Sequence, residues 1–409
     1  MSIKTQFERL LKIPSRLREV TQAYVISLIQ DSGRRTLQAA ATLSGLNPSQ
    51  FSRFLCGHKE LAIENLNRLL RRRVRRALVK NRALITGAPW KVALIIDATL
   101  HERSSRHLDN AQRFNHGQGW VIGHQWTNLV LVINDETIPL PPIPFLTMQT
   151  CKKLKQPYLT EAERIIGFLS GWDWKSLLPG VSAQEFVVLS DSGYDNKSLQ
   201  NFFLTQGWDF IGSLKKSRSV KTETQAWQSV EALFQNTRKI GPWQTVRHET
   251  NGGKNRRSIR LRSLLGSLKG VRREVRLISS QKPNKERLHL ACSKKDLSPG
   301  AITRAYKLRW KVEIFHREVK SYLGFEDAGL AQFEAVHAHV LWVYCAYLLL
   351  LEVGEQDNVP GGTLARRRHL ETRLRNETIG QILKANARFD SQRAVIDQCL
   401  QVRQRMMTA

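Results

Sequence analysis

The chain has 409 residues, of which 41% are hydrophobic, and a formal net charge of +29 at pH 7. This length predicts two to four structural units, and the hydrophobic content excludes a disordered chain. The excess of Lys and Arg indicates a polyanionic partner, DNA or RNA by default. Residues 1–90 hold 17 Lys and Arg against 5 Asp and Glu, and residues 215–290 hold 19 against 5. We therefore expect two separate surfaces that contact nucleic acid.

Three features bear on the compartment. The N-terminus lacks the apolar core of a signal peptide. The most apolar run, Val340 to Val353, is shorter than the ~20 residues that cross a bilayer, so we expect a buried helix there. The five cysteines are scattered without a CxxC pair, which favours neither disulfides nor a zinc site. These features predict a cytoplasmic protein that does not contact a membrane.

Residues 1–88 are predicted to form a helical DNA-binding domain, because apolar positions recur at helical spacing. Residues 36–56 fit a helix-turn-helix, in which Gly45 suits the turn and Asn47 and Pro48 begin the second helix. A plain helical hairpin is the alternative. In a helix-turn-helix, the second helix would present three residues to DNA: Ser49, Gln50 and Arg53.

A run of arginines follows at Arg71–Arg76, with the sequence RRRVRR. It could form the solvated face of a helix. Given the overall charge, we favour contact with phosphates by Arg71, Arg72 and Arg73.

From Trp90 onward the pattern changes to alternating strands and helices. The run WKVALIID is typical of a buried strand ending at Asp97, and HQWTNLVLVIN predicts a second strand. A capping box at Thr160–Glu163 opens a helix. EFVVLS is a further buried strand that ends before Asp191, and DFIGSL predicts one more. We assign residues 89–214 and 291–353 to one α/β core.

The basic stretch 215–290 alternates weakly, with a predicted hairpin turn at the NGG of 251–253, so we expect a β-rich insertion. Ser298 and Pro299 then begin a long helix that runs to Leu323 and ends at Gly324. An apolar helix follows it, and residues 354–409 are predicted to form a charged helical tail.

One face of the helix 299–323 concentrates reactive side chains. Tyr306, Arg309, Glu313 and Lys320 stand at steps of three, four and seven, within roughly 60° of one another around the helix. The opposite face carries an apolar stripe of Leu308, Val312, Phe315, Val319 and Tyr322. The alternative is an exposed face with Arg309 and Glu313 as an ordinary ion pair.

Asp97 and Asp191 each follow an apolar, strand-like run, which places them at the rim of a sheet, where α/β proteins bind ligands. Carboxylates that converge there with Glu313 repel one another unless a cation neutralises them. Hard oxygen ligands suit Mg²⁺ or Mn²⁺, and two such ions can activate an attacking oxygen and stabilise a leaving oxygen at phosphorus.

These residues also carry a family resemblance. The pattern Y-x(2)-R-x(3)-E-x(6)-K resembles the Y-R-E-K signature of bacterial insertion-sequence transposases of the DDE type. The blocks IIDATLHERS and SDSGYDNKSLQNFFLTQGWDFIGSLKKS are similar to the blocks around that family's two aspartates. The resemblance covers residues 90–350.

The resemblance implies an α/β, RNase H-like mixed-sheet core interrupted by a mostly β insertion, with Asp97, Asp191 and Glu313 as ligands of two Mg²⁺ or Mn²⁺ ions. It implies cut-and-paste transposition at inverted-repeat ends, double-stranded DNA as partner and target, and a homodimer on DNA. It further implies DNA contacts by Tyr306, Arg309 and Lys320, and base stacking by Trp227 or Trp243, each of which could instead be a core residue. The alternatives are an RNase H-fold nuclease without strand transfer and an inactive DNA-binding regulator.

Several assignments stay open. Asp195 could replace Asp191, although Asp191 directly follows the strand. Glu318 could replace Glu313, although about 140° of helix rotation separates them. Thr99 would share a strand face with Asp97 if the strand continued. We expect His316 to be solvated or to face DNA rather than to bind metal. His337 and His339 form an HxH pair, but no Cys or carboxylate pattern there supports a metal site.

Overall fold

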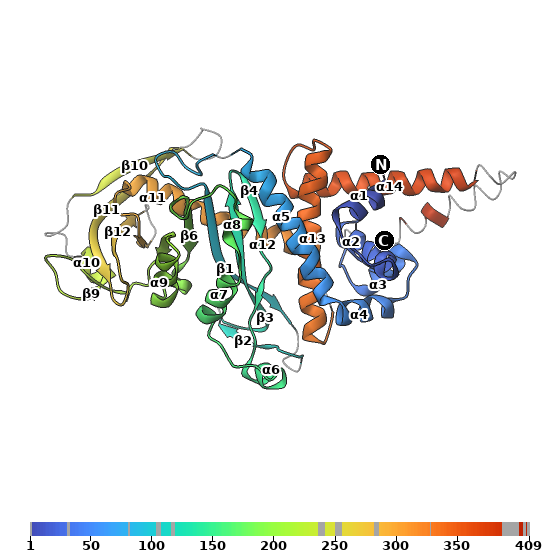
Figure 1. Ribbon diagram of the computed structural model, residues 1–409, viewed down its shortest axis with the longest axis horizontal. Helices are drawn as coiled ribbons and strands as arrows, with labels where there is room; N and C mark the ends of the chain where they lie inside the picture. The colour runs from blue at the N-terminus through green and yellow to red at the C-terminus, as the bar shows by residue number, and fades with distance from the viewer. Residues whose placement is uncertain are drawn as a thin grey trace.

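The computed structural model describes residues 2–30, 33–80, 82–103, 108–115, 119–235, 242–249, 256–281, 286–327, 329–386, 401–403 and 406. The fold is mixed α/β, as predicted. One long mixed sheet runs through part of the molecule, and the helices of the chain gather around its centre and at the end where the termini lie (Figure 1).

The central part of the sheet contains the two strands that were expected to end at the aspartates. In order across the sheet it consists of β2 (Gln112–Asn115), β3 (Trp120–Ile133), β1 (Val92–Glu102), β6 (Phe186–Ser190) and β7 (Asp209–Ser213). β1, β6 and β7 are parallel, and β3 runs antiparallel to β1. The short strands β4 (Glu136–Pro139) and β5 (Ile143–Pro144) also pair with β3. β6 is buried along its whole length, which explains its continuous apolar sequence.

The basic stretch continues this same sheet. Its strands are β8 (Ser219–Lys221), β9 (Gln228–Ser229), β10 (Gln244–Glu249), β11 (Arg256–Leu268), β12 (Glu274–Gln281) and β13 (Leu288–Cys292), with the helix α10 (Val230–Gln235) among them. β13 pairs antiparallel with β7, so the inserted strands are hydrogen-bonded to the core. β10 pairs antiparallel with β11, whereas the predicted turn at 251–253 lies outside the described residues.

Short helices connect and cover the central strands. They are α6 (Met148–Lys153), α7 (Glu161–Ser170), α8 (Trp174–Leu177) and α9 (Lys197–Thr205), with 3₁₀ turns η2 (Ala183–Glu185) and η3 (Ser192–Tyr194). The predicted capping box is present at the start of α7, where Thr160 and Glu163 bond each other's backbone.

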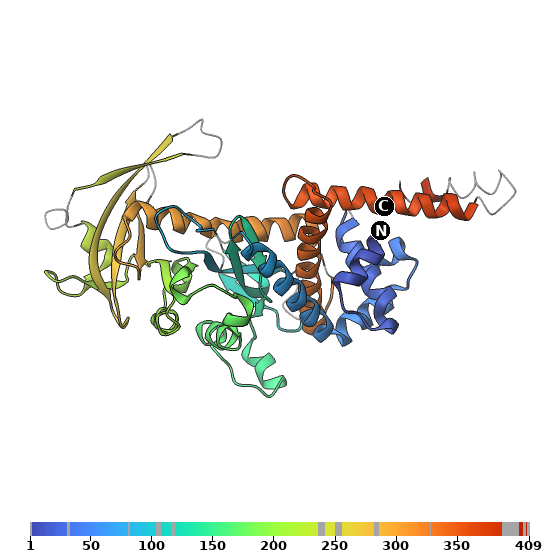
Figure 2. The same cartoon turned by 45° about the horizontal axis from the view of Figure 1, so that its top comes forward.

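The helix predicted at 299–323 is broken. It consists of α11 (Pro299–Tyr306), a 3₁₀ turn η5 (Lys307–Arg309) and α12 (Trp310–Leu323). The three parts form a rod that reaches from the inserted strands to the helices at the other end (Figure 2). The rod begins at the Ser298 cap as expected, and it ends at Gly324, whose φ of 71° places it in the left-handed region that terminates helices.

The apolar run lies in α13 (Phe333–Gln356). This helix is long and apolar enough to cross a membrane by length and composition, but 94% of its apolar window is buried inside the protein. The predicted buried helix is confirmed, and it is longer than the run that revealed it. α14 (Thr363–Asn386) follows and packs against α13.

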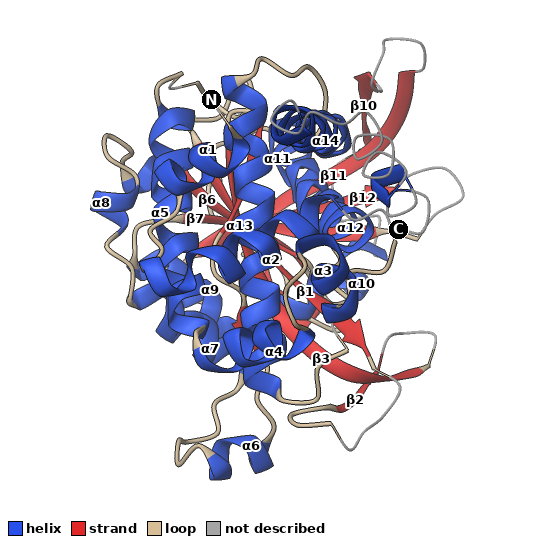
Figure 3. Cartoon of the chain, turned by 90° about the vertical axis from the view of Figure 1, so that its right-hand side faces the viewer, coloured by secondary structure: helices blue, strands red, loops and turns tan. Residues whose placement is uncertain are grey.

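The N-terminal helices lie beside α13, and α2, α4 and α5 pack against it (Figures 1 and 3). They are α1 (Ile3–Leu10), η1 (Ser15–Leu17), α2 (Arg18–Gln30), α3 (Leu37–Ser44), α4 (Pro48–Gly57) and α5 (Lys59–Leu78). The ring of Phe54 lies 5.7 Å from that of Trp342, and the Tyr24 hydroxyl lies 2.6 Å from Nδ1 of His339. The helices at the N-terminus therefore share a core with the rest of the chain.

Candidate active site

Asp97 and Asp191 occupy equivalent places on neighbouring parallel strands. The pairing of β1 with β6 ends at Ile96 and Ser190, and each aspartate is the next residue. Strand β1 was expected to end at Asp97 and instead continues to Glu102, because β3 still pairs with it there. Thr99 therefore lies on the same strand face as Asp97.

Glu313, on α12, approaches Asp97 from the helix side. Potential ligand atoms of Asp97, Glu313 and His316 all lie within 4.8 Å of one another. Burial, together with the negative charges of Glu313 and Asp191, raises the pKa of Asp97 to about 7 against the opposing effect of Arg309. The two strand aspartates and the helix glutamate are thus close enough to interact electrostatically.

Arg309 lies between two of these carboxylates. Its Nη1 is 3.4 Å from Oδ2 of Asp97, and its Nη2 is 3.2 Å from Oε1 of Glu313. Burial disfavours the charged form of this guanidinium, yet its pKa is raised, because Tyr306 and the surrounding carboxylates stabilise the cation.

Tyr306 and Lys320 flank this centre on the same rod. Burial raises the pKa of the Tyr306 hydroxyl, which bonds to Ser213 on β7. Lys320 donates from Nζ to the Leu100 carbonyl at 2.8 Å and pairs with Glu326 at 2.7 Å. The four residues of the signature therefore extend along the ends of β7 and β1, with Arg309 and Glu313 at the carboxylates.

Asp191 is held by its own loop. It caps η3, and its Oδ1 accepts the backbone N–H of Gly193 at 2.9 Å. A Cβ at Gly193 would lie 3.0 Å from that oxygen, so glycine suits the close approach. Asp191 does not belong to the tighter group formed by Asp97, Glu313 and His316.

His316 was expected to be solvated or to face DNA, and this expectation was wrong. The side chain is 8% exposed, and burial lowers its pKa to about 3. Its Nε2 lies 2.6 Å from Nδ2 of Asn128, whose Oδ1 accepts from the Tyr344 hydroxyl. Because the amide donates to Nε2, the neutral ring carries its proton on Nδ1. The only signal in the sequence is its position one turn after Glu313.

The alternative ligands are engaged elsewhere. Asp195 is 1% exposed, with Oδ1 3.4 Å from Nε of Arg218. Burial raises the pKa of Glu318, which hydrogen-bonds to Thr363. His339 uses both ring nitrogens, on Tyr24 and on the Gly324 carbonyl. Burial lowers the pKa of His337 to about 3.

The donor set fits a divalent cation. Asp97 and Glu313 provide hard oxygen ligands, and a bound cation would relieve the repulsion that raises the pKa of Asp97. The structure thus contains an acidic site with a histidine beside it that could hold a metal ion.

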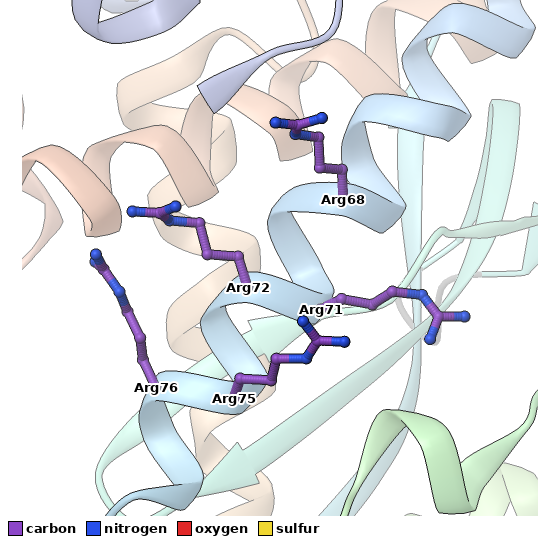
Figure 4. Close-up of a pocket in the computed structure, with 5 residues that line it drawn as sticks. All are labelled: Arg68, Arg71, Arg72, Arg75 and Arg76. Atoms are coloured by element: carbon purple, nitrogen blue, oxygen red, sulfur yellow. The ribbon is translucent and has the colours of Figure 1, made fainter. Parts of the chain in front are cut away.

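Five arginines gather on α5, where Arg68, Arg71, Arg72, Arg75 and Arg76 line a hollow of about 600 Å³ (Figure 4). Arg72 and Arg76 pair with the buried Glu352 at 2.6 and 2.9 Å. Arg71 bonds Ser176 at 3.5 Å and lies over the ring of Trp172. These contacts tie part of the cluster to the core and leave it open on one side.

Arg73 does not contribute to this hollow, contrary to the prediction. It is 3% exposed and pairs with Glu136 at 2.6 Å and with Glu355. At about 100° per residue, position 73 lies about 200° around α5 from Arg71, so its side chain points toward Glu136 and Glu355 and away from the hollow.

The remaining predicted DNA contacts lie at the surface. Ser49, Gln50 and Arg53 are exposed on α4, where Oε1 of Gln50 accepts the backbone N–H of Asn47 at 2.9 Å. Trp227 is 46% exposed, whereas Trp243 is half-buried among arginines. Trp310, which directly follows Arg309 and is 62% exposed, is a further exposed aromatic residue that the sequence patterns did not single out.

These features define a mixed α/β protein with an acidic, cation-compatible site at the ends of two parallel strands. Residues 172–349 match the family model of the transposase DDE domain. The predicted resemblance to transposases of the DDE type is confirmed over these residues. Asp191 and the whole signature lie within the match, whereas Asp97 precedes it. No curated protein matches the chain.

Proposed function

We propose that the protein is a DNA transposase that cleaves and joins strands at inverted-repeat ends by cut-and-paste transposition. Asp97, Asp191 and Glu313 are its catalytic residues and metal ligands. The observation that supports this most directly is the convergence of Asp97 and Glu313, with Arg309 between them. The strand order β3-β1-β6-β7 supports an RNase H-like core.

Two Mg²⁺ or Mn²⁺ ions, when bound, would polarise the attacked phosphodiester and activate the attacking oxygen. The protein's own side chains position the substrate. Arg309 is suited to bind a phosphate with two parallel N–H donors, because its guanidinium would be available once a cation neutralised Asp97 and Glu313. Tyr306 and Lys320 extend this contact along the rod.

Other surfaces would hold the rest of the DNA. We assign the N-terminal helices of residues 1–88 to recognition of the ends, with Arg53 on α4 and Arg71 and Arg72 on α5 as phosphate contacts. Trp227 and Trp310 are exposed enough to stack on bases. Joining two ends would require at least a dimer on DNA, acting in the cytoplasm.

The experiment uses the purified full-length protein, Mg²⁺, and the DNA that flanks its own gene on either side. We expect nicks at the borders of an inverted repeat and joining of the released end to a second duplex. Asp97→Asn, Asp191→Asn and Glu313→Gln should each abolish both products while retaining DNA binding. Full activity in these three variants would refute the catalytic assignment.

The same assay separates two other functions. Cleavage without a joined product would identify a nuclease of this fold. Binding to the ends with steep salt dependence and no metal-dependent cleavage would identify a DNA-binding regulator.

A further inference from the structure

A cluster of positive charge surrounds Trp243 in the inserted strands, away from the carboxylates. The guanidinium carbons of Arg262, Arg260 and Arg287 lie 4.7, 5.5 and 5.8 Å from the centre of its indole ring. Arg260 and Arg262 are two residues apart on β11, so both project from the same face of the sheet. Three cations therefore converge on one aromatic ring.

The central arginine is buried without hydrogen-bond partners for most of its donors. Arg262 is 9% exposed, and its Nε and Nη1 atoms make no hydrogen bond to any described residue. A buried guanidinium that lacks partners carries a large desolvation cost, and a stacked ring compensates only part of it. Such donors indicate a ligand that accepts hydrogen bonds.

A second unpartnered group lies beside it. Ser279, on β12, is directly opposite Arg262 in the strand register, so both side chains share a face. Ser279 is fully buried, and its Oγ also lacks a hydrogen-bond partner among the described residues. The next residue across the sheet, His289, donates through Nε2 to Glu231 at 2.7 Å and stays outside this donor set.

Among the described residues, Glu231 is a carboxylate near the cluster, and its bond to His289 and the charge of Arg287 lower its pKa. Within the described part of the chain, Arg260, Arg262 and Arg287 form no ion pair; Arg260 bonds the amide of Gln281 at 3.2 Å, and Arg287 contacts the Phe234 carbonyl at 3.5 Å. Like charges held this close repel one another, and an anion would relieve the repulsion. Arginine donors in a fork match the oxygens of a phosphate.

We infer that Arg260, Arg262 and Arg287 form a phosphate-binding site for the backbone of a DNA strand, with Trp243 as the platform that aligns the guanidiniums. This inference rests on the proposed function for the identity of the polyanion. It also changes the role of Trp243, since a ring covered by arginines positions phosphate donors and is not free to stack on a base.

The test measures binding of a short duplex of fixed length to the full-length protein in EDTA, over a series of salt concentrations. Each lost phosphate contact should reduce the slope of log K against log salt by about 0.9. We expect this reduction for Arg262→Gln and for Arg287→Gln. The second variant removes only a half-exposed side chain, so it should preserve the fold. Arg273→Gln is the matched control, because it removes an exposed arginine of the same insertion and should leave the slope unchanged.

An unchanged slope in Arg287→Gln and Arg262→Gln, with the fold intact by circular dichroism, would overturn the inference. So would an equal reduction in Arg273→Gln, which would show a general effect of net charge. Since binding is measured without metal, loss of this site is distinguishable from failure of the proposed transposase activity, which is tested by cleavage and joining in Mg²⁺.

Discussion

Nη1 of Arg309 lies 3.4 Å from Oδ2 of Asp97, so the guanidinium offsets the same negative charge that a metal ion bound to Asp97 would offset. Under the proposed function, a cation that neutralises the carboxylates would leave Arg309 available to a phosphate of the DNA. The same side chain would then link the charge of the site to its substrate.

Arg309→Lys keeps the charge but loses the fork of two donors. We expect cleavage to fall by about 10²-fold or more, comparable to the loss of one preorganised donor at a transition state. Single-turnover cleavage of end-bearing DNA measures this. A variant that cleaves at the rate of the parent protein would contradict the proposed role in gripping phosphate.

Asp97→Asn should stabilise the metal-free protein at alkaline pH. The folded-state pKa of Asp97, about 7, lies above its ordinary value of 3.8, so the folded protein binds this proton more tightly and loses stability as the pH rises from about 4 to 7. The variant removes that cost. We expect its melting temperature to exceed that of the parent by about 2 °C at pH 8 in EDTA, and the two to converge at pH 4.

Glu313→Gln and Glu318→Gln form a matched pair on one helix. Glu313 faces Asp97, whereas Glu318 hydrogen-bonds to Thr363. The first variant should lose metal-dependent cleavage, and it should also lose the thermal stabilisation that Mn²⁺ gives the parent protein. The second should retain both. The reverse result would reassign the ligand on α12.

Asp191→Asn and Asp195→Asn should differ in stability and in cleavage. Asp195 is buried against Arg218, and leaving a buried charge unpaired costs about 3–5 kcal/mol. Denaturant unfolding should therefore show a marked loss of stability for Asp195→Asn. Asp191→Asn should unfold like the parent and fail to cleave DNA. A stable, inactive Asp195→Asn would favour Asp195 as the ligand.

Arg73→Met and Arg75→Met test the two faces of α5. Arg73 is buried with Glu136 and next to Glu352, so its loss should destabilise the fold by about 3–5 kcal/mol. Arg75 lines the hollow on the exposed face, so its loss should weaken DNA binding and leave unfolding unchanged. Equal effects of the two variants on unfolding would contradict this division.

The sequence was informative where a local pattern alone decides the outcome. Helical spacing placed Arg309 and Glu313 on one face, and the end of an apolar run placed Asp191 at the sheet rim. It was misleading where a distant segment decides. The burial of His316 depends on Asn128 and Tyr344, and that of Arg73 depends on Glu136 and Glu355. Neither partner set is adjacent in the chain, so periodicity could not reveal it.

The pairing of β7 with β13 has a mechanical consequence. β6, which ends directly before Asp191, is hydrogen-bonded to β7, and β7 is hydrogen-bonded to β13, the last strand of the insertion. Backbone hydrogen bonds thus fix the distance and orientation between the carboxylates and the arginines around Trp243. If a DNA strand bound at both places, the fixed distance between them would determine which phosphodiester bond lies at the carboxylates and is cut.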